Sequence, residues 1–144
     1  MMDASASAPA HAADESAPRL RREEIDQLAD DIAVLAARID SASQQLLRHI
    51  RRFDEAGGWA RQGALSCAHW LSWRVGVDLP AAREQGRTAR ALALLPLIDA
   101  ALGRGELSYS KVRALTRVAG EHNEELLLDL ARGATGAQLE KVVR

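Results

Sequence analysis

The chain has 144 residues, a length that suits one domain and is too short for two substantial ones. It carries 19 Lys and Arg against 20 Asp and Glu, and its single cysteine excludes a disulfide framework and a CxxC-type zinc or redox motif. No run of about 18 apolar residues occurs, and the first residues lack the basic and apolar regions of a secretory signal, so we expect no membrane span and a cytoplasmic location. Alanine, leucine and arginine are abundant, whereas β-branched residues are scarce, which predicts an all-α fold.

Residues 1–18 are rich in Ala, Ser and Pro and contain little to bury, which predicts a disordered tail. Residues 19–144 are predicted to form one helical domain. Its first element, over residues 20–56, is a helix of about 35 residues, because apolar and core-edge positions recur there at alternating spacings of three and four. These positions are Ile25, Leu28, Ile32, Leu35, Ile39, Ala42, Leu46, His49 and Phe53.

This long helix has two interpretations. Its heptad repeat is compatible with a coiled-coil homodimer. However, Ala29, Ala36 and Ile50 widen the apolar stripe, and charges such as Asp31 and Arg38 face no opposite charge at the e positions. A wide stripe without such pairs is more typical of a helix in an intramolecular bundle, so we expect the stripe to lie in the core and keep self-association as the alternative.

The remaining helices are separated by glycines, prolines and capping residues. The helix that begins near Ser66 is expected to bury Leu71, Val75 and the tryptophans, and Trp59, Trp70 and Trp73 are all expected in the core. Gly57–Gly58, Gly76, Pro96 and Gly105 mark breaks, and Thr135 with Gln138 has the pattern of a capping box. The predicted helices therefore cover about 66–75, 79–95, 97–103, 109–120, 123–132 and the residues after 135.

The segment from Leu71 to Gln85 has the spacing of a helix–turn–helix motif, with Gly76 at the turn and the small Ala82 at the helix crossing. The second of its helices would present Arg83, Arg87 and Arg90 on one face. Segment 83–117 holds seven basic and three acidic residues, the main basic concentration of the chain. We therefore predict that Arg83, Arg87 and Arg90, with Lys111, Arg113 and Arg117 as secondary candidates, contact phosphates of duplex DNA. The other interpretation is an ordinary helical hairpin with a solvated arginine face.

Other chemistry has little support in the sequence. The four histidines show no metal-ligand spacing, and Cys67, beside a helix start, is expected to be a small buried residue. We find no nucleophile–base arrangement and no phosphate-binding glycine loop. The sequence therefore predicts no catalytic residue, no metal site and no cofactor for this chain.

The order of these landmarks resembles the domain of unknown function 222, also called the 13E12 repeat family. The resemblance covers about residues 20–144 and rests on Gly58-Trp59, Gly63, Ser66, Trp70-Leu71, Gly76, Ala82, Arg87, Ala89-Arg90-Ala91-Leu92, Leu95-Pro96, Ala100-Ala101-Leu102, Gly105-Glu106-Leu107-Ser108, Val112 and Leu115. It implies a helical accessory domain of bacterial HNH endonuclease-like proteins. In such proteins a downstream module would bind the divalent metal and cut DNA, and we expect that module to be absent here.

Together, these observations predict a non-catalytic helical accessory domain that associates with DNA through an arginine-bearing helix. The alternatives are a protein-interaction or oligomerisation module that acts through the long helix 20–56, or a truncated remnant without activity of its own.

Overall fold

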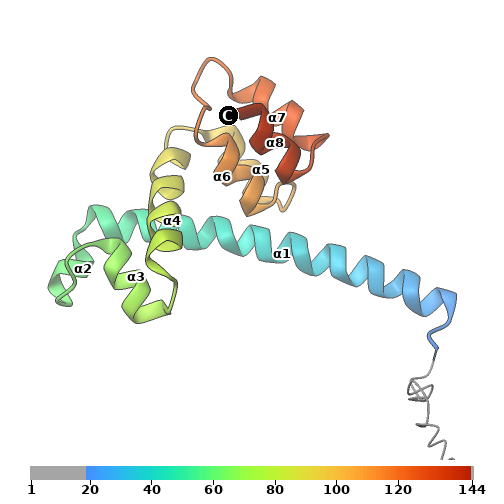
Figure 1. Cartoon of the computed structure of the whole chain (residues 1–144), viewed down its shortest axis with the longest axis horizontal. Helices are drawn as coiled ribbons and strands as arrows, with labels where there is room; N and C mark the ends of the chain where they lie inside the picture. Colours follow the sequence, from blue (N-terminus) through green and yellow to red (C-terminus); the bar gives the residue numbers. More distant parts are fainter. Residues whose placement is uncertain (1–18, 144) are drawn as a thin grey trace, which may run out of the picture.

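The computed structural model of the chain describes residues 19–143, so the predicted disordered tail 1–18 lies outside the described residues. Within this range the chain forms eight α-helices and no strand, which confirms the all-α fold (Figure 1). The helices are α1 (Arg22–Glu55), α2 (Gly58–Arg61), α3 (Cys67–Val75), α4 (Leu79–Leu92), α5 (Pro96–Gly103), α6 (Tyr109–Leu115), α7 (Glu124–Arg132) and α8 (Gly136–Val143). Across residues 19–143, no helix is both long and apolar enough to cross a membrane.

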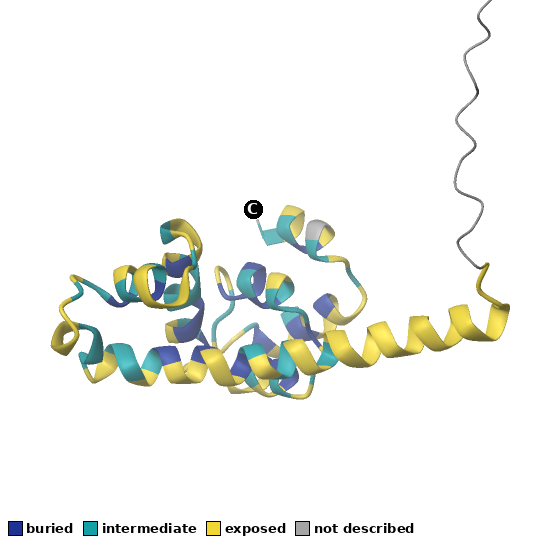
Figure 2. Cartoon of the chain, turned by 90° about the horizontal axis from the view of Figure 1, so that it is seen from below, coloured by how far each residue is buried: buried dark blue, intermediate teal, exposed yellow. Residues whose placement is uncertain are grey.

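Helix α1 has 34 residues and is therefore about 51 Å long. At its N-terminus, the Arg21 backbone N–H donates to the Glu24 carboxylate at 2.8 Å. Its C-terminal half packs against α4 and α5 and also contacts α2 and α3. Its N-terminal half projects beyond the other helices and is exposed on every side (Figures 1 and 2).

Capping residues define the starts of α3 and α4 and the turn between them. The Ser66 hydroxyl accepts the backbone N–H of His69 at 3.1 Å, and the Asp78 carboxylate accepts that of Ala81 at 2.8 Å. Gly76 ends α3 with a φ of +83°, a value that favours glycine. The predicted starts of both helices are therefore confirmed, and so is the start of α8, where Thr135 and Gln138 form their capping box.

The core lies between the C-terminal half of α1 and helices α3 to α8. Its largest fully buried apolar side chains are Ile98, Leu102, Leu107, Val112, Leu115 and Leu139. Ala82 and Ala89 of α4 are also buried, as expected for small residues that allow close helix packing. Cys67 is buried, as predicted, and this burial raises the pKa of its thiol.

The predicted core position of the long apolar stripe is wrong for its N-terminal residues, whereas Phe53 at its C-terminal end packs partly buried against the core. The side chains of Ile25, Leu28, Ile32, Leu35 and Ile39 are 47–66% exposed. The buried residues of α1 are instead Gln44 and Leu47, which lie on a different face, and Ile50, which borders the stripe at its C-terminal end. The body of the molecule thus packs on one side of α1, and the stripe faces solvent.

Two further predictions, the burial of the tryptophans with Val75 and the end of α6, also differ from the structure. Trp73 is 69% exposed and Val75 is 55% exposed, whereas Trp59 and Trp70 are partly buried. The indole N–H groups of these two partly buried tryptophans form hydrogen bonds. Trp59 Nε1 donates to Asp54 at 3.1 Å, and Trp70 Nε1 donates to Gln62 at 2.7 Å. Helix α6 ends at Leu115, five residues earlier than predicted, and the chain continues through a turn that leads into α7.

Candidate functional site: the arginines of α4 and the exposed face of α1

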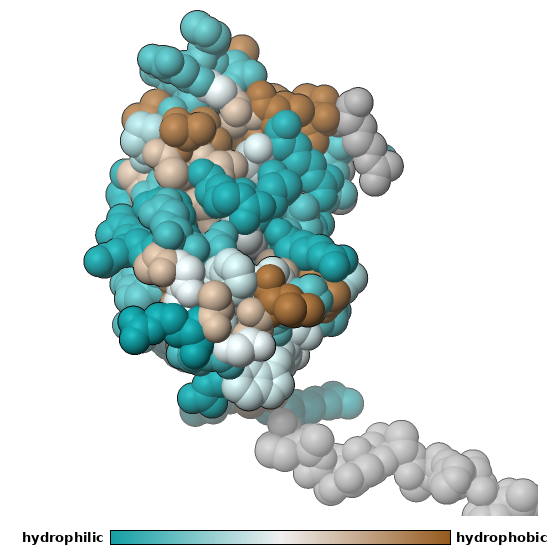
Figure 3. Space-filling model, turned by 90° about the vertical axis from the view of Figure 1, so that its left-hand side faces the viewer, coloured by the Kyte–Doolittle hydropathy of each residue, from teal (hydrophilic) through white to brown (hydrophobic). Residues whose placement is uncertain are grey.

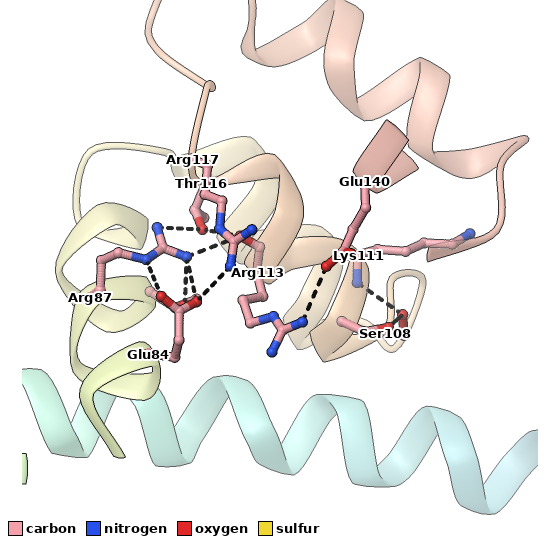
Figure 4. A network of polar contacts seen from close by, with 10 residues as sticks. Glu84, Arg87, Ser108, Lys111, Arg113, Thr116, Arg117 and Glu140 are labelled. Carbon is pink, nitrogen blue, oxygen red and sulfur yellow. Dashed lines mark hydrogen bonds and ion pairs between the residues drawn. The ribbon is translucent and has the colours of Figure 1, made fainter. Parts of the chain in front are cut away.

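The central arginine of the predicted DNA-binding row, Arg87, is bound within the fold. Its guanidinium donates to both oxygens of Glu84, with distances of 2.9 Å from Nε and 3.1 Å from Nη2 (Figure 4). The same Nη2 donates to the backbone carbonyl of Arg113 at 3.0 Å, and Nη1 donates to the Thr116 hydroxyl at 3.3 Å. Arg87 therefore links α4 to α6 and to the residue that follows α6.

Glu84 is shared by two arginines, because Arg117 also reaches its carboxylate at 3.4 Å (Figure 4). The hydrogen bond from Arg87, together with the charges of Arg87 and Arg117, holds the pKa of Glu84 below its ordinary value. The Glu84 carboxylate is therefore ionised at neutral pH, and its charge offsets part of the positive charge of Arg87 and Arg117.

Most other predicted DNA-binding residues also have partners. Arg90 lies 3.5 Å from Asp54 of α1, and Arg113 lies 3.2 Å from Glu140 of α8. The Lys111 ammonium donates to the backbone carbonyl of Ala131 at 2.9 Å. Arg83 is exposed and forms neither a hydrogen bond nor an ion pair with any residue in the range 19–143. Five of the six residues thus have partners within the fold, here called the arginine network, and the six do not form a continuous free row.

An arginine that pairs with a carboxylate has part of its charge offset and some of its N–H donors occupied, which weakens its attraction for a phosphate. The DNA contact stays a prediction, and its sharpest test is the release of the paired arginines. We expect Glu84→Gln to increase the steepness of log K against log salt for duplex DNA by up to about 1.8, because Arg87 and Arg117 lose the counter-charge of the carboxylate and each phosphate contact contributes about 0.9.

The matched control for this measurement is Glu121→Gln. Glu121 is an exposed carboxylate that contacts none of these arginines, so its replacement makes the same change in net charge without freeing a guanidinium. Equal salt dependence in the two variants, or no binding by either of them at low salt, would contradict a role for the α4 arginines in DNA binding.

The second candidate surface is the exposed face of α1. The five exposed residues Ile25, Leu28, Ile32, Leu35 and Ile39, here called the α1 stripe, follow the a and d positions of a heptad repeat. Ala42, Leu46 and His49 continue the same positions towards the C-terminal end and are also exposed. The stripe therefore extends along a helix of which the N-terminal half touches no other helix (Figure 1).

Contacts on the opposite face hold α1 against the body. The Ser41 hydroxyl donates to the backbone carbonyl of Gly103 at 2.8 Å, and the Gln44 amide donates to the Asp99 carboxylate at 3.2 Å. Gly105, with a φ of +74°, lies so close to α1 that a Cβ atom there would sit 2.7 Å from the carbonyl oxygen of Ala37. These contacts fix the orientation of α1 and leave the stripe free.

An apolar groove lies where the heptad positions reach α3. It has a volume of about 280 Å³ and is lined by Leu46, His49, Ile50, Phe53, Trp70, Leu71 and Val75. The rings of Phe53 and Trp70, both part of its lining, are tilted by 46° to one another, with their centres 4.4 Å apart. The end of the molecule that carries α2 and α3 otherwise shows hydrophilic side chains mixed with small, separate apolar patches (Figure 3).

Comparisons with known proteins give no assignment: no protein-family model, curated protein or solved structure matches the chain. The resemblance to the domain of unknown function 222 therefore stays a prediction from the residues. In the described part of the chain, no three or more His, Cys, Asp and Glu residues are grouped so that they could hold a metal ion. The geometry of the α1 stripe and of the arginine network is thus the main evidence about function.

Proposed function

We propose that this protein is an oligomerisation module that associates through the α1 stripe. The observation that carries the proposal is the exposure of five large aliphatic side chains at consecutive heptad positions of a projecting helix. Contiguous exposed apolar surface of this kind marks interaction sites in soluble proteins. The remaining core forms without the stripe, so the fold does not explain why these positions are apolar.

The free energy gained by burying the stripe is of the same order as the cost of association. Complete burial of one Leu or Ile side chain stabilises by about 1.5–3 kcal/mol, and roughly half of that remains to be gained for a side chain that is half exposed. Ten such side chains from two copies would contribute on the order of 10 kcal/mol. This gain is comparable to the cost of association, about 4–15 kcal/mol, which is consistent with a reversible complex of moderate affinity.

Replacement of one stripe residue by lysine tests the proposal. We expect the mass of the wild-type chain to rise to that of an oligomer with increasing concentration in sedimentation equilibrium. Leu35→Lys should raise the dissociation constant about 100-fold or more, because each copy would bury a charged group in place of an apolar one.

The control is Ala33→Lys, which adds the same charge at an exposed position on a different face of α1. It should leave the mass unchanged, and circular dichroism should show equal helix content in the two variants. A wild-type chain that is monomeric at every concentration, or equal weakening by both substitutions, would contradict the proposed function.

A further inference from the structure

We infer that the partner of the α1 stripe is a second copy of α1 in antiparallel orientation, with Asp31 of each copy facing Arg38 of the other. The inference rests on the proposed function and adds the partner, its direction and the residues that select it. Three observations carry it: the order of apolar residues along the stripe, the charges that flank the stripe, and the side of α1 on which the body packs.

The apolar residues fit a two-stranded arrangement. Ile25, Ile32 and Ile39 occupy the a positions, and Leu28, Leu35 and Ala42 occupy the d positions. In an antiparallel pair, an a residue of one helix packs beside a d residue of the other. When the pair is centred between residues 33 and 34, Ile32 meets Leu35, Leu28 meets Ile39, and Ile25 meets Ala42. The contact then extends over residues 25–42, or about 27 Å of helix.

The flanking residues complement one another in this alignment. Two antiparallel helices bring their g positions together on one side and their e positions together on the other. At the g positions, Asp31 of each copy faces Arg38 of the other, and Glu24 faces Gln45. At the e positions, Ala29 faces Ala36, and these small side chains allow the helices to approach closely. The arrangement contains two opposite-charge pairs and no facing like charges at the positions 24–45 that flank the seam.

Other alignments lack this complementarity. In a parallel pair each g residue faces an e residue of the next heptad, so Asp31 would meet Ala36 and Arg38 would meet Ser43. A shift of the antiparallel pair by one heptad in either direction places Asp31 opposite its own copy or Arg38 opposite its own copy. Flanking charges of this kind set the partner and the orientation of coiled coils by penalising the wrong alignments.

The body leaves room for this partner. Ala37, Ser41 and Gln44 contact the α5–α6 region from positions on the opposite side of α1 from the stripe. Heptad positions remain exposed as far as Leu46 and His49, so the second helix can extend along α1 beside the body rather than against it. The N-terminal end of the second α1 would then approach the apolar groove beside Leu46.

Charge reversal tests the orientation. Asp31→Arg and Arg38→Asp should each weaken the homodimer about tenfold, because two attractive pairs become repulsive in either variant. The double variant with both changes on one chain should regain wild-type affinity. A one-to-one mixture of the two single variants should form a heterodimer that is at least as stable as the wild type, since all four facing charges then attract. Sedimentation equilibrium of the full chain gives all of these dissociation constants.

Cysteine cross-linking gives an independent measure of direction. In a Cys67→Ser background, chains with Ile25→Cys should cross-link to chains with Ala42→Cys under oxidation, and neither variant should cross-link efficiently to itself. Self-cross-linking of the Ile25→Cys chain, or single charge reversals without effect on a dimer that still forms, would overturn the antiparallel pairing and leave the proposed function intact. A monomeric wild-type chain would overturn both.

Discussion

Replacement of Glu124 by Ala is expected to lower the free energy of unfolding by about 2–3 kcal/mol. Glu124 begins α7, is only 6% exposed, and its carboxylate accepts the backbone N–H groups of Leu97 and Ile98 at 2.7 and 2.9 Å. These two groups belong to the first turn of α5 and have no partner within their own helix. Without the carboxylate, the buried N–H of Ile98 and the partly buried N–H of Leu97 lose their acceptor, a defect that costs about 1–3 kcal/mol for an unpaired buried group.

Urea denaturation measures this effect, and Glu125→Ala is its control. Glu125 lies in the same first turn of α7 and carries the same charge, but it is exposed. Both proteins should carry Leu35→Lys as well, so that association does not contribute to the measured stability. A small effect of Glu125→Ala together with a large effect of Glu124→Ala is expected. Equal effects would show that helix-terminal charge, rather than the two hydrogen bonds, accounts for the stabilisation.

Gly105→Ala is expected to destabilise the fold by about 2–4 kcal/mol. The φ of +74° at this position by itself costs an L residue about 1–2 kcal/mol. In addition, the new Cβ atom would lie 2.7 Å from the backbone oxygen and 3.0 Å from the Cβ of Ala37. Since a helix backbone cannot move as freely as a side chain, the turn after α5 and helix α1 must separate, and part of their packing is lost.

The substitution Gly63→Ala separates the cost of the positive φ from the cost of the close contact with Ala37. Gly63 has a similar φ of +85°, but an added Cβ atom there would meet no atom within 4 Å. The difference between the two variants in chemical denaturation therefore reports the close approach of the turn to α1. We expect Gly105→Ala to cost at least about 1 kcal/mol more than Gly63→Ala. If the two losses are equal, the clash is relieved without cost and the contact does not anchor α1.

The contacts of α1 with the body explain how this helix can both pack against the other helices and present the α1 stripe to a partner. Gly105, Ser41 and Gln44 fix α1 from its inner side, and the α1 stripe lies on the outer side. The helix is therefore presented rigidly even though its N-terminal half contacts no other helix. Because little conformational freedom has to be lost when a second helix binds, a modest apolar area can support association.

Local sequence signals determined much of this protein. The scarcity of β-branched residues, the helix start near Ser66, the capping box of Thr135 with Gln138, and the breaks at Gly76 and Pro96 predict an all-α chain and the bounds of several of its helices. These signals act within one or two helical turns, so they are readable from neighbouring residues alone. The heptad spacing likewise identifies the apolar face of α1 without any knowledge of its surroundings.

Only the tertiary structure decided what that face and the arginines contact. A heptad pattern is the same whether its seam is filled by the body of the molecule or by another chain, and here the body packs against the face that contains Gln44, Leu47 and Ile50. The partners of the arginines are equally remote in sequence, because Arg90 pairs with Asp54 and Arg117 with Glu84, 36 and 33 residues away. Such pairings depend on how helices are placed in space, which spacing along a single helix does not encode.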